Sequence, residues 1–158
     1  MKTHQASKTS FFQRYEQAYI SRQIKNPDKG SNFEIASRYF RWLPEYLLIQ
    51  LLKIAKYDGI LFYENDQIIG HIFYQKHPEG WKVFSVHVSD NLRGKGYGQK
   101  MISTFLITAH NQGLKRVRIG AGGSVTLEHI CTKVISGGLT LPFKVRRGDT
   151  TGWLNFVQ

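Results

Sequence analysis

The residues best suited to chemistry in this sequence gather in one short stretch, Arg93-Gly94-Lys95-Gly96-Tyr97-Gly98. It follows an alternating, strand-like segment that ends at Val88 and precedes a segment of helical periodicity. Glycine lets backbone N–H groups turn inward without a Cβ in the way, and the start of a helix adds partial positive charge. Lys100 adds a full charge nearby. The stretch therefore predicts a cradle for a phosphate or pyrophosphate.

The spacing of the glycines distinguishes between kinds of phosphate site. The lysine-serine ending of a nucleotide-hydrolase P-loop is missing, and the order is G-x-G-x-G rather than the G-x-G-x-x-G of dinucleotide-binding folds. No acidic residue lies where a dinucleotide site needs its ribose ligand. A turn whose glycines serve packing alone is the alternative to a ligand site.

The stretch resembles the hallmark of the GNAT superfamily of acetyltransferases, Gln/Arg-x-x-Gly-x-Gly/Ala between a strand and a helix. The segment Phe62 to Gly70 is similar to the hairpin between the family's second and third strands. Val88 stands five residues before Arg93, the usual offset of the strand residue that contacts pantetheine. The resemblance covers Ile60 to about Val157. It implies an α+β (mixed α/β) fold with a mixed, mostly antiparallel sheet flanked by helices and a helical N-terminal region.

The resemblance implies an acyl-CoA-dependent N-acyltransferase that moves an acetyl group from acetyl-CoA to a primary amine by direct attack, without a metal. The turn amides would hold the coenzyme A pyrophosphate, and the pantetheine arm would pair with the preceding strand. The N–H of Val88 would stabilise the oxyanion of the thioester. The implied cofactor-binding residues are Val86, His87, Val88, Arg93, Gly94, Lys95, Gly96, Tyr97, Gly98, Gln99 and Ser124.

The general base is left open by the resemblance. An alkylamine with a pKa of roughly 10 is mostly protonated at neutral pH, so some group must take its proton. Relatives often carry this base on the fourth strand, on the face of the residue equivalent to Val88. Alternation puts Val86, Phe84 and Lys82 on that face, and none is a convincing base, while His87 points the other way. The remaining candidates are His71 on the neighbouring strand, Glu34 and Glu45 on the early helices, and a water chain.

The proton donor for the leaving thiolate is equally open. Relatives often use a tyrosine on the last helix, but the segment Val125 to Ser136 has none. Cys131 falls near that position when Ser124 is aligned with a frequently seen asparagine. Cys131 also lies on the apolar stripe of the helix, which favours a role as a small buried hydrophobe. A thiol with a pKa of about 8.5 leaves tolerably as a thiolate, so this gap does not exclude activity.

The elements that must position these residues change character near residue 60. Before it, capping boxes at Ser10–Gln13 and Ser31–Glu34 predict helices, and Pro44 predicts the start of another that runs to Asp58-Gly59. The first residues, Met1–Thr9, lack a strand pattern. Beyond residue 60 the expected order is strands 60–64 and 67–75 around a tight turn at 65–66, strand 81–88, helix 98–113, strand 117–121, helix 127–137, and strands 139–145 and 153–157. Pro142 requires that its strand lie at an edge of the sheet.

Length and composition predict one domain of 158 residues. Residues 1–59 are expected to form a mostly helical acceptor-side segment, and residues 60–158 the sheet and cofactor-binding core. No apolar run has membrane-spanning length, and the first ten residues lack the apolar core of a signal peptide. The single cysteine, Cys131, rules out an internal disulfide, so a cytoplasmic protein is expected.

The charge distribution suggests an anionic ligand or partner. The net charge is +11; residues 91–158 carry 10 Lys/Arg against 2 Asp/Glu, and residues 1–90 carry 12 against 9. Such a field favours coenzyme phosphates, an acidic carrier protein or nucleic acid, and a merely solvated basic face is the alternative. The shortage of acidic residues counts against strongly cationic acceptors. It favours an amino acid, an acidic metabolite, a protein N-terminus or an RNA-linked aminoacyl group.

Two other functions stay open. An acidic acyl carrier protein could be the acyl donor, with Phe11, Phe12, Tyr15 and Tyr19 lining an acyl channel, although aromatics at helical spacing are usually core residues. The basic second half could instead bind tRNA or rRNA without catalysis, but it lacks an evident stacking platform. The sequence does not determine whether the protein forms oligomers.

Overall fold

The computed structural model describes residues 2–5, 19–27, 33–64, 67–120, 125–148 and 152–157, with only the backbone described for 2–5 and 125–126. Residues 19–25 are helical. The other elements, in chain order, are β1 (Lys2–Gln5), α2 (Phe33–Phe40), α3 (Glu45–Ile54), β2 (Tyr57–Glu64), β3 (Gln67–His77), β4 (Gly80–Val88), a 3₁₀ turn (Asp90–Leu92), α4 (Tyr97–Asn111), β5 (Arg116–Ile119), α5 (Val125–Ile135), β6 (Lys144–Arg147) and β7 (Trp153–Val157).

The strands form one mixed sheet in the order β1-β2-β3-β4-β5-β7-β6. Every neighbouring pair in this order is antiparallel except β4 and β5, which are parallel and are connected through α4. A parallel pair needs a crossover connection, and here α4 supplies it. The mixed, mostly antiparallel sheet flanked by helices confirms the fold class predicted from the sequence.

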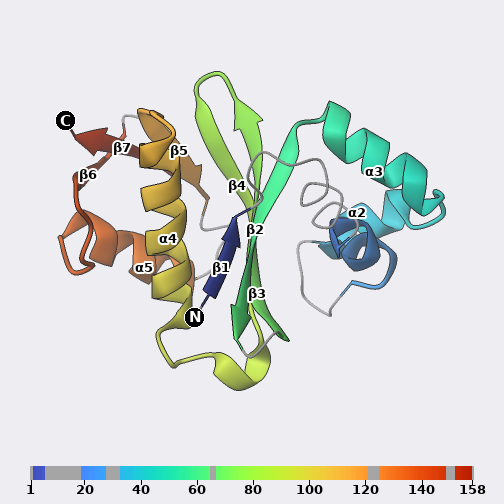
Figure 1. Cartoon of the computed structure of the whole chain (residues 1–158), viewed down its shortest axis with the longest axis horizontal. Coiled ribbons are helices and arrows are strands. Elements are labelled where there is room, and N and C mark those ends of the chain that lie inside the picture. Colours follow the sequence, from blue (N-terminus) through green and yellow to red (C-terminus); the bar gives the residue numbers. More distant parts are fainter. Residues whose placement is uncertain are drawn as a thin grey trace.

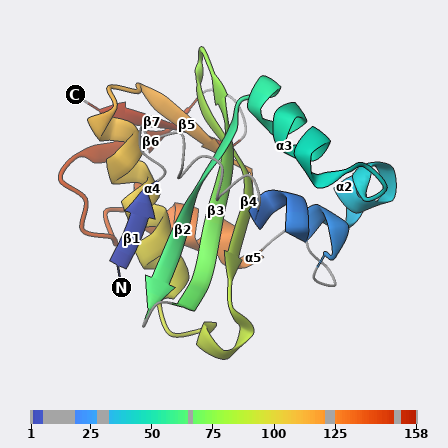
Figure 2. The same cartoon turned by 45° about the vertical axis from the view of Figure 1, so that its right-hand side comes forward.

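The sheet separates two clusters of buried side chains. The larger lies between the sheet and α4 and α5, and includes Met101 and Phe105 of α4 and Ile130 of α5. The smaller lies under the N-terminal helices and is centred on Phe33 and Phe73. Figures 1 and 2 show α2 and α3 on one side of the molecule and α4 on the other. The strand residues at the sheet centre therefore face two different environments.

Several expected elements are confirmed. Strands β2 and β3 pair as the predicted hairpin, although its turn at 65–66 lies outside the described residues. Pro44 is the N-cap of α3, as its place before an apolar run predicted. The helix expected to begin near Gly98 begins at Tyr97, with Gly96 as its N-cap. The first capping box, Ser10–Gln13, and residues 31–32 of the second lie outside the described residues.

Three boundaries differ from expectation. The absence of a strand in the first nine residues was wrong, because Lys2–Gln5 pair with β2. The helix expected to reach Asp58-Gly59 ends at Ile54, and both residues belong to β2. There the Asp58 carboxylate accepts a hydrogen bond from the Gly59 amide and forms an ion pair with Lys76. The strand expected over 139–145 begins only at Lys144, so Pro142 precedes it. The edge position expected for that strand is correct, because β6 closes the sheet.

One irregularity in β4 changes which side chains share a face. The pairing with β3 passes from Phe73↔Ser85 to Tyr74↔Val83, which leaves Phe84 as an extra residue. Val83, Val86 and Val88 pack against the larger cluster, whereas Phe84 packs with Phe33 in the smaller one. The expectation that Phe84 and Lys82 share a face with Val88 was therefore wrong, because a β-bulge interrupts the alternation.

Candidate functional site

β4 and β5 separate soon after they begin to run side by side. Their pairing covers only Trp81↔Val117, Lys82↔Arg118 and Val83↔Ile119. The pairing of β4 with β3 continues to Gly70↔Val88. From Phe84 onward, the edge of β4 that faces away from β3 is therefore unpaired with any described strand.

The backbone groups on this open edge can be identified from alternation. The Ser89 N–H donates to the Ile69 carbonyl at 2.9 Å, so the polar groups of Ser89 face β3. Successive residues of a strand direct their N–H and C=O to opposite sides, so those of Val88 and Val86 face the open edge. The Val88 carbonyl indeed accepts a bond from Arg93 Nε at 3.2 Å, outside the ladder. The Val88 amide points into the same gap.

The glycine turn continues this edge. Arg93 N–H donates to the Asp90 carbonyl, and Lys100 N–H donates to the Gly96 carbonyl. Between them, the amides of residues 94–99 donate to no acceptor in the part of the chain that the structure describes. Gly94 and Gly96 have φ of 76° and 82°, a conformation that favours glycine, and a Cβ on either would meet no atom of the described residues within 4 Å. These amides, without a described acceptor, lie where the turn leads into the N-terminus of α4, and Figure 1 shows the path of the chain there.

The flanks of the turn are fixed by packing and by charge. A Cβ on Gly98 would lie 3.4 Å from Ile130 Cδ1, so this glycine lets α4 approach α5. The Tyr97 hydroxyl donates to the Glu64 carboxylate, 2.9 and 3.0 Å from its two oxygens, and this bond raises the tyrosine pKa. Arg93 pairs with Asp90 at 2.8 Å. Tyr97, Gly98 and Arg93 thus hold the turn in place, and sequence reasoning gave no role to Glu64.

His71 lies on β3, buried on the side of the N-terminal helices. Its ring stacks on Phe73 at 4.3 Å and meets Phe33 and Tyr19 edge-on at 5.9 and 5.6 Å. Nε2 lies 3.2 Å from Ser85 Oγ, and Nδ1 has no hydrogen-bond partner among the described residues. Burial, together with the nearby His87, lowers the pKa of His71 to about 3. At neutral pH the imidazole is therefore uncharged.

His87 lies opposite His71 in the β3–β4 pairing. The two rings stack at 5.3 Å with an angle of 18° between their planes. His87 is half-buried, and it directly precedes Val88 in the chain. The structure thus brings a second histidine to the side of the sheet that the N-terminal helices cover, next to the open edge of β4. The sequence predicted only that His87 faces away from Val88; its proximity to His71 and Ser85 could not be predicted, because only the cross-strand register brings them together.

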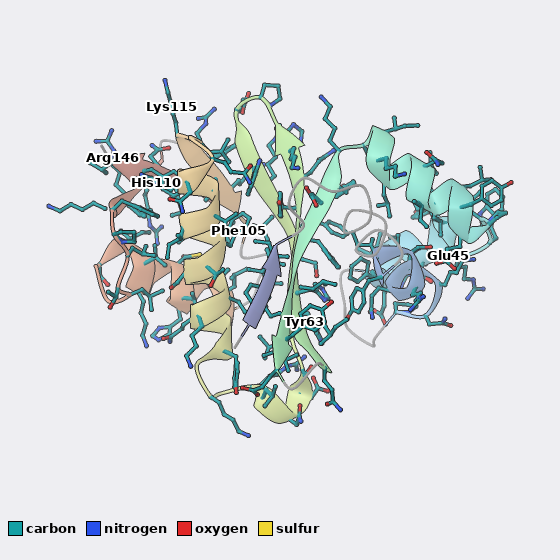
Figure 3. All side chains as sticks on the ribbon, viewed as in Figure 1. Glu45, Tyr63, Phe105, His110, Lys115 and Arg146 are labelled. Carbon is teal, nitrogen blue, oxygen red and sulfur yellow. The ribbon has the colours of Figure 1, made fainter. Side chains whose placement is uncertain are left out.

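The other expected catalytic residues are placed differently. Cys131 is buried in the larger cluster, where desolvation and the nearby Glu128 raise its pKa to about 11. Glu34 is half-exposed on α2. Glu45 is exposed at the start of α3, at the end of the molecule opposite α4 (Figure 3). Ser124 lies outside the described residues.

The aromatic set proposed for an acyl channel is only partly described. Phe11, Phe12 and Tyr15 lie outside the described residues. Tyr19 packs against His71 and Phe73, at the back of the histidine pair. Within the described ranges, no three His, Cys, Asp or Glu side chains gather as a metal site would require. No helix found there combines the length and the apolar character needed to cross a bilayer.

Comparison with known proteins agrees with the fold and with the turn. The model of the acetyltransferase (GNAT) family matches residues 22–124. Tetrahymena GCN5 is 13% identical to this chain, with a TM-score of 0.52 over 99% of this chain and 95% of that one. Aminoglycoside 6′-acetyltransferase type Ii is 11% identical, with a TM-score of 0.52 over 98% and 95%.

A third similar structure is the spermidine N-acetyltransferase SpeG chimera from Vibrio cholerae and hSSAT. It is 11% identical, with a TM-score of 0.53 over 83% of this chain and 79% of that one. No curated protein matches the chain in sequence. At such low identities the structural matches establish a common fold, while the family model extends over more than half of the sequence. The chain therefore belongs to the GNAT acetyltransferase family, and the protein is an acetyltransferase.

Proposed function

We propose that the protein is an acetyl-CoA-dependent N-acetyltransferase whose coenzyme lies along the open edge of β4 and ends in the glycine turn. The observation that carries this proposal is a row of backbone amides without a described acceptor, which runs from Val86 and Val88 on the open edge of β4 to residues 94–99 in the turn. The family's activity and this edge point to the same ligand. The whole chain, 1–158, is taken as one acyltransferase unit.

The residues at the turn fit a diphosphate. The amides of residues 94–99 offer donors with no described acceptor, and the open space beside Gly94 and Gly96 leaves room for an anion. Arg93, Lys95 and Lys100 surround the same spot with positive charge, and the N-terminus of α4 adds its dipole. An unpaired strand edge likewise suits an extended chain with amide groups, because it can be paired like an added strand.

When bound, acetyl-CoA supplies an activated thioester. The Val88 N–H faces the gap beside it and is placed to donate to an oxygen that becomes negative during acyl transfer. One preorganised donor of this kind contributes about 10²-fold to 10³-fold in rate. The position of the Val88 N–H depends on the β3–β4 pairing and on the Arg93 side chain, which donates a hydrogen bond to the Val88 carbonyl.

For the proton of the acceptor amine, we propose His87 as the base and His71 as a positioning residue. His87 is the half-buried member of the stack and adjoins Val88. His71 is held between Phe73 and His87, with Ser85 at its Nε2, and stays uncharged. A neutral neighbour lets His87 take up a proton without a second positive charge beside it. Burial raises the pKa of the Cys131 thiol to about 11, above the value of about 8.5 for an ordinary thiol, so Cys131 is a weak acid and the coenzyme is proposed to leave as the thiolate.

The acceptor is proposed to be a small-molecule or peptide amine. Two of the similar structures carry names of enzymes for spermidine and for aminoglycosides, both rich in amino groups. The described side chains around the half-buried His87 and the buried His71, however, are aromatic rings, namely those of Tyr19, Phe33 and Phe84. A face without described carboxylates favours an amine carried on an uncharged or acidic molecule.

The test is a titration of the protein with acetyl-CoA, followed by thermal unfolding and calorimetry. Wild type should gain several degrees in Tm at saturating ligand, because a ligand that binds only the folded state stabilises it. Gly96→Glu should remove the gain. Gly113→Glu is the matched control: Gly113 has φ of 77° and open space, but it lies at the other end of α4. An unchanged gain in Gly96→Glu, or a chain that ignores acetyl-CoA and binds tRNA with steep salt dependence, would overturn the proposal.

A further inference from the structure

The exposed large apolar side chains of the described residues are concentrated in one segment of the chain. All large hydrophobic side chains that are exposed in the described ranges lie on α2, on α3 or on the turn between these helices. On α2 these are Ile35, Tyr39 and Phe40. Trp42 follows in the turn, with 74% of its surface exposed. Scattered exposed apolar residues are normal, but a contiguous run of this kind marks an interaction surface.

The same pattern continues on α3. Leu47, Leu51 and Ile54 recur at helical spacing, with Ile54 exposed to 77%, and Tyr46 extends the run towards the turn. The neighbouring stripe of α3, with Leu48 buried, faces the protein. These two helices therefore bury one apolar stripe and present another outward. We call the outward stripe, from Ile35 to Ile54, the α2–α3 face.

Two hydrogen bonds hold the turn between α2 and α3 in place, so the exposed position of Trp42 is a fixed part of the fold. The Trp42 indole N–H donates to the Tyr39 carbonyl at 2.6 Å, which fixes the ring at the end of α2. Lys25 Nζ donates to the Leu43 carbonyl at 2.8 Å and holds the turn against the helix at 19–25. An indole held in place and exposed loses little side-chain entropy when a partner covers it. The α2–α3 face is therefore preorganised for contact.

We propose that the α2–α3 face is the interface of a homodimer, in which it covers the same face of a second copy. Eight side chains that each expose on the order of 100 Å² give a face of roughly 800 Å², the area that one partner contributes to a standard interface. A two-fold axis lets one self-complementary patch cover itself completely. Aromatic residues, which are enriched at interface cores, make up half of this set.

The distribution of charge favours a second copy over an anionic partner. Residues 33–54 carry two acidic and three basic side chains, so the α2–α3 face is close to neutral. The excess of cations is elsewhere: Lys115 and Arg146, from the basic second half, lie at the end of the molecule opposite Glu45 (Figure 3). Two copies can therefore meet through this face while their strongly basic ends point apart. A lipid surface or an acidic protein would instead be attracted to those ends.

The dimer also bears on the site. The inner side of α2 carries Phe33, which is fully buried and meets His71, Phe73 and Phe84 edge-on. In the dimer, one side of α2 would therefore contact the second copy, while its other side contacts the side chains behind the histidine pair.

The experiment is sedimentation velocity of the wild-type chain over a concentration series, together with one pair of matched variants. Wild type should be a dimer with a Kd of roughly micromolar or tighter. Ile54→Lys should shift the Kd upward by at least about tenfold, because it puts like charges on both sides of the interface. Gln112→Lys adds the same charge at an exposed position near the end of α4, and should leave the Kd unchanged.

Crosslinking identifies the face independently. The chain's only cysteine, Cys131, is buried, so Trp42→Cys and Gln112→Cys each introduce one accessible thiol. A short bis-maleimide should join Trp42→Cys into covalent dimers and leave Gln112→Cys without a covalent crosslink between copies. A wild type that stays monomeric, a dimer insensitive to Ile54→Lys, or a monomer that binds phosphatidylglycerol vesicles through this face would each refute the homodimer. Thermal unfolding of each variant distinguishes lost assembly from lost folding.

Discussion

The imidazole rings of His71 and His87 lie almost parallel, 5.3 Å apart, at directly opposed positions of β3 and β4. The two rings nevertheless experience different surroundings. His71 is enclosed by Phe73, Phe33 and Tyr19, whereas His87 is half-buried. One cross-strand pair thus combines an enclosed imidazole that is held neutral with a half-buried one. The first two predictions follow from this difference.

The protein should lose stability on acidification because of His71. Its folded pKa of about 3 lies below the unfolded value of 6.5, so the unfolded chain binds the proton first. The stability is fully present above pH 6.5 and is lost as the pH falls towards 3. Between pH 6.5 and 4.5, wild type should lose about 2 kcal/mol more than His71→Phe, which keeps the stack but does not titrate. Urea unfolding at each pH measures this, with exposed His129→Gln as the control that should behave like wild type.

Replacement of His87 should affect turnover more than coenzyme affinity. A positioned general base contributes about 10² to 10⁴ in rate, so His87→Gln should lower kcat by at least about 10²-fold and flatten the acid limb of the pH–rate profile. His71→Asn, through lost positioning, should lower kcat less and retain the shape of that profile. The matched control is His110→Gln, because His110 also stacks on an aromatic ring, Phe143, but belongs to α4. Equal profiles for wild type and His87→Gln would exclude His87 as the base.

A methyl group at Gly70 should disrupt the centre of the sheet. A Cβ there would lie 2.5 Å from the His87 carbonyl oxygen and 2.9 Å from Met101 Sδ. The clash with backbone on one side and with α4 on the other should make Gly70→Ala less stable by about 1 to 3 kcal/mol. Gly120→Ala is the control, since a Cβ there meets no described atom within 4 Å and the backbone is not left-handed. Chemical denaturation of both variants compares them, and equal midpoints would contradict the predicted clash.

The Tyr97–Glu64 hydrogen bonds should connect the β2–β3 hairpin to the coenzyme turn. The hydroxyl lies within 3.0 Å of both carboxylate oxygens, and the bond raises the tyrosine pKa. Tyr97→Phe should lower the urea midpoint and weaken acetyl-CoA binding. Glu64→Gln should bring the ionisation of Tyr97, followed by absorbance at alkaline pH, back towards its ordinary value. The double variant should be less destabilised than the two single effects added together, and strict additivity would show that the contact has no energetic role.

The turn and the hairpin could be predicted because their information is local. Glycines at fixed offsets specify a backbone conformation, and Gly94 and Gly96 indeed adopt positive φ. The apolar alternation of β2 and β3 likewise identified the hairpin from short-range pattern. Gly98 was assigned to the coenzyme turn, yet its immediate neighbour is Ile130 of α5, a contact that no local pattern contains.

The features that escaped prediction depend on pairing partners distant in the chain. Lys2–Gln5 have no apolar alternation and become a strand because β2 offers an edge to pair with. The bulge at Phe84 is set by the register against β3, and it moves Phe84 to the opposite face. Ser85 and Glu64 gained their roles in the same way, through contacts made across the sheet and to α4.

The short pairing between β4 and β5 has a further consequence for hydrogen exchange along β4. Along one strand, the amides of residues 85 and 87 are locked into the neighbouring ladder, while those of 86 and 88 have no described acceptor on the open side. Deuterium uptake should therefore alternate residue by residue, slow and fast, over this segment. A ligand bound in the gap between β4 and β5 would slow deuterium uptake at residues 86 and 88 alone. Exchange along β4 would therefore show whether the ligand is bound.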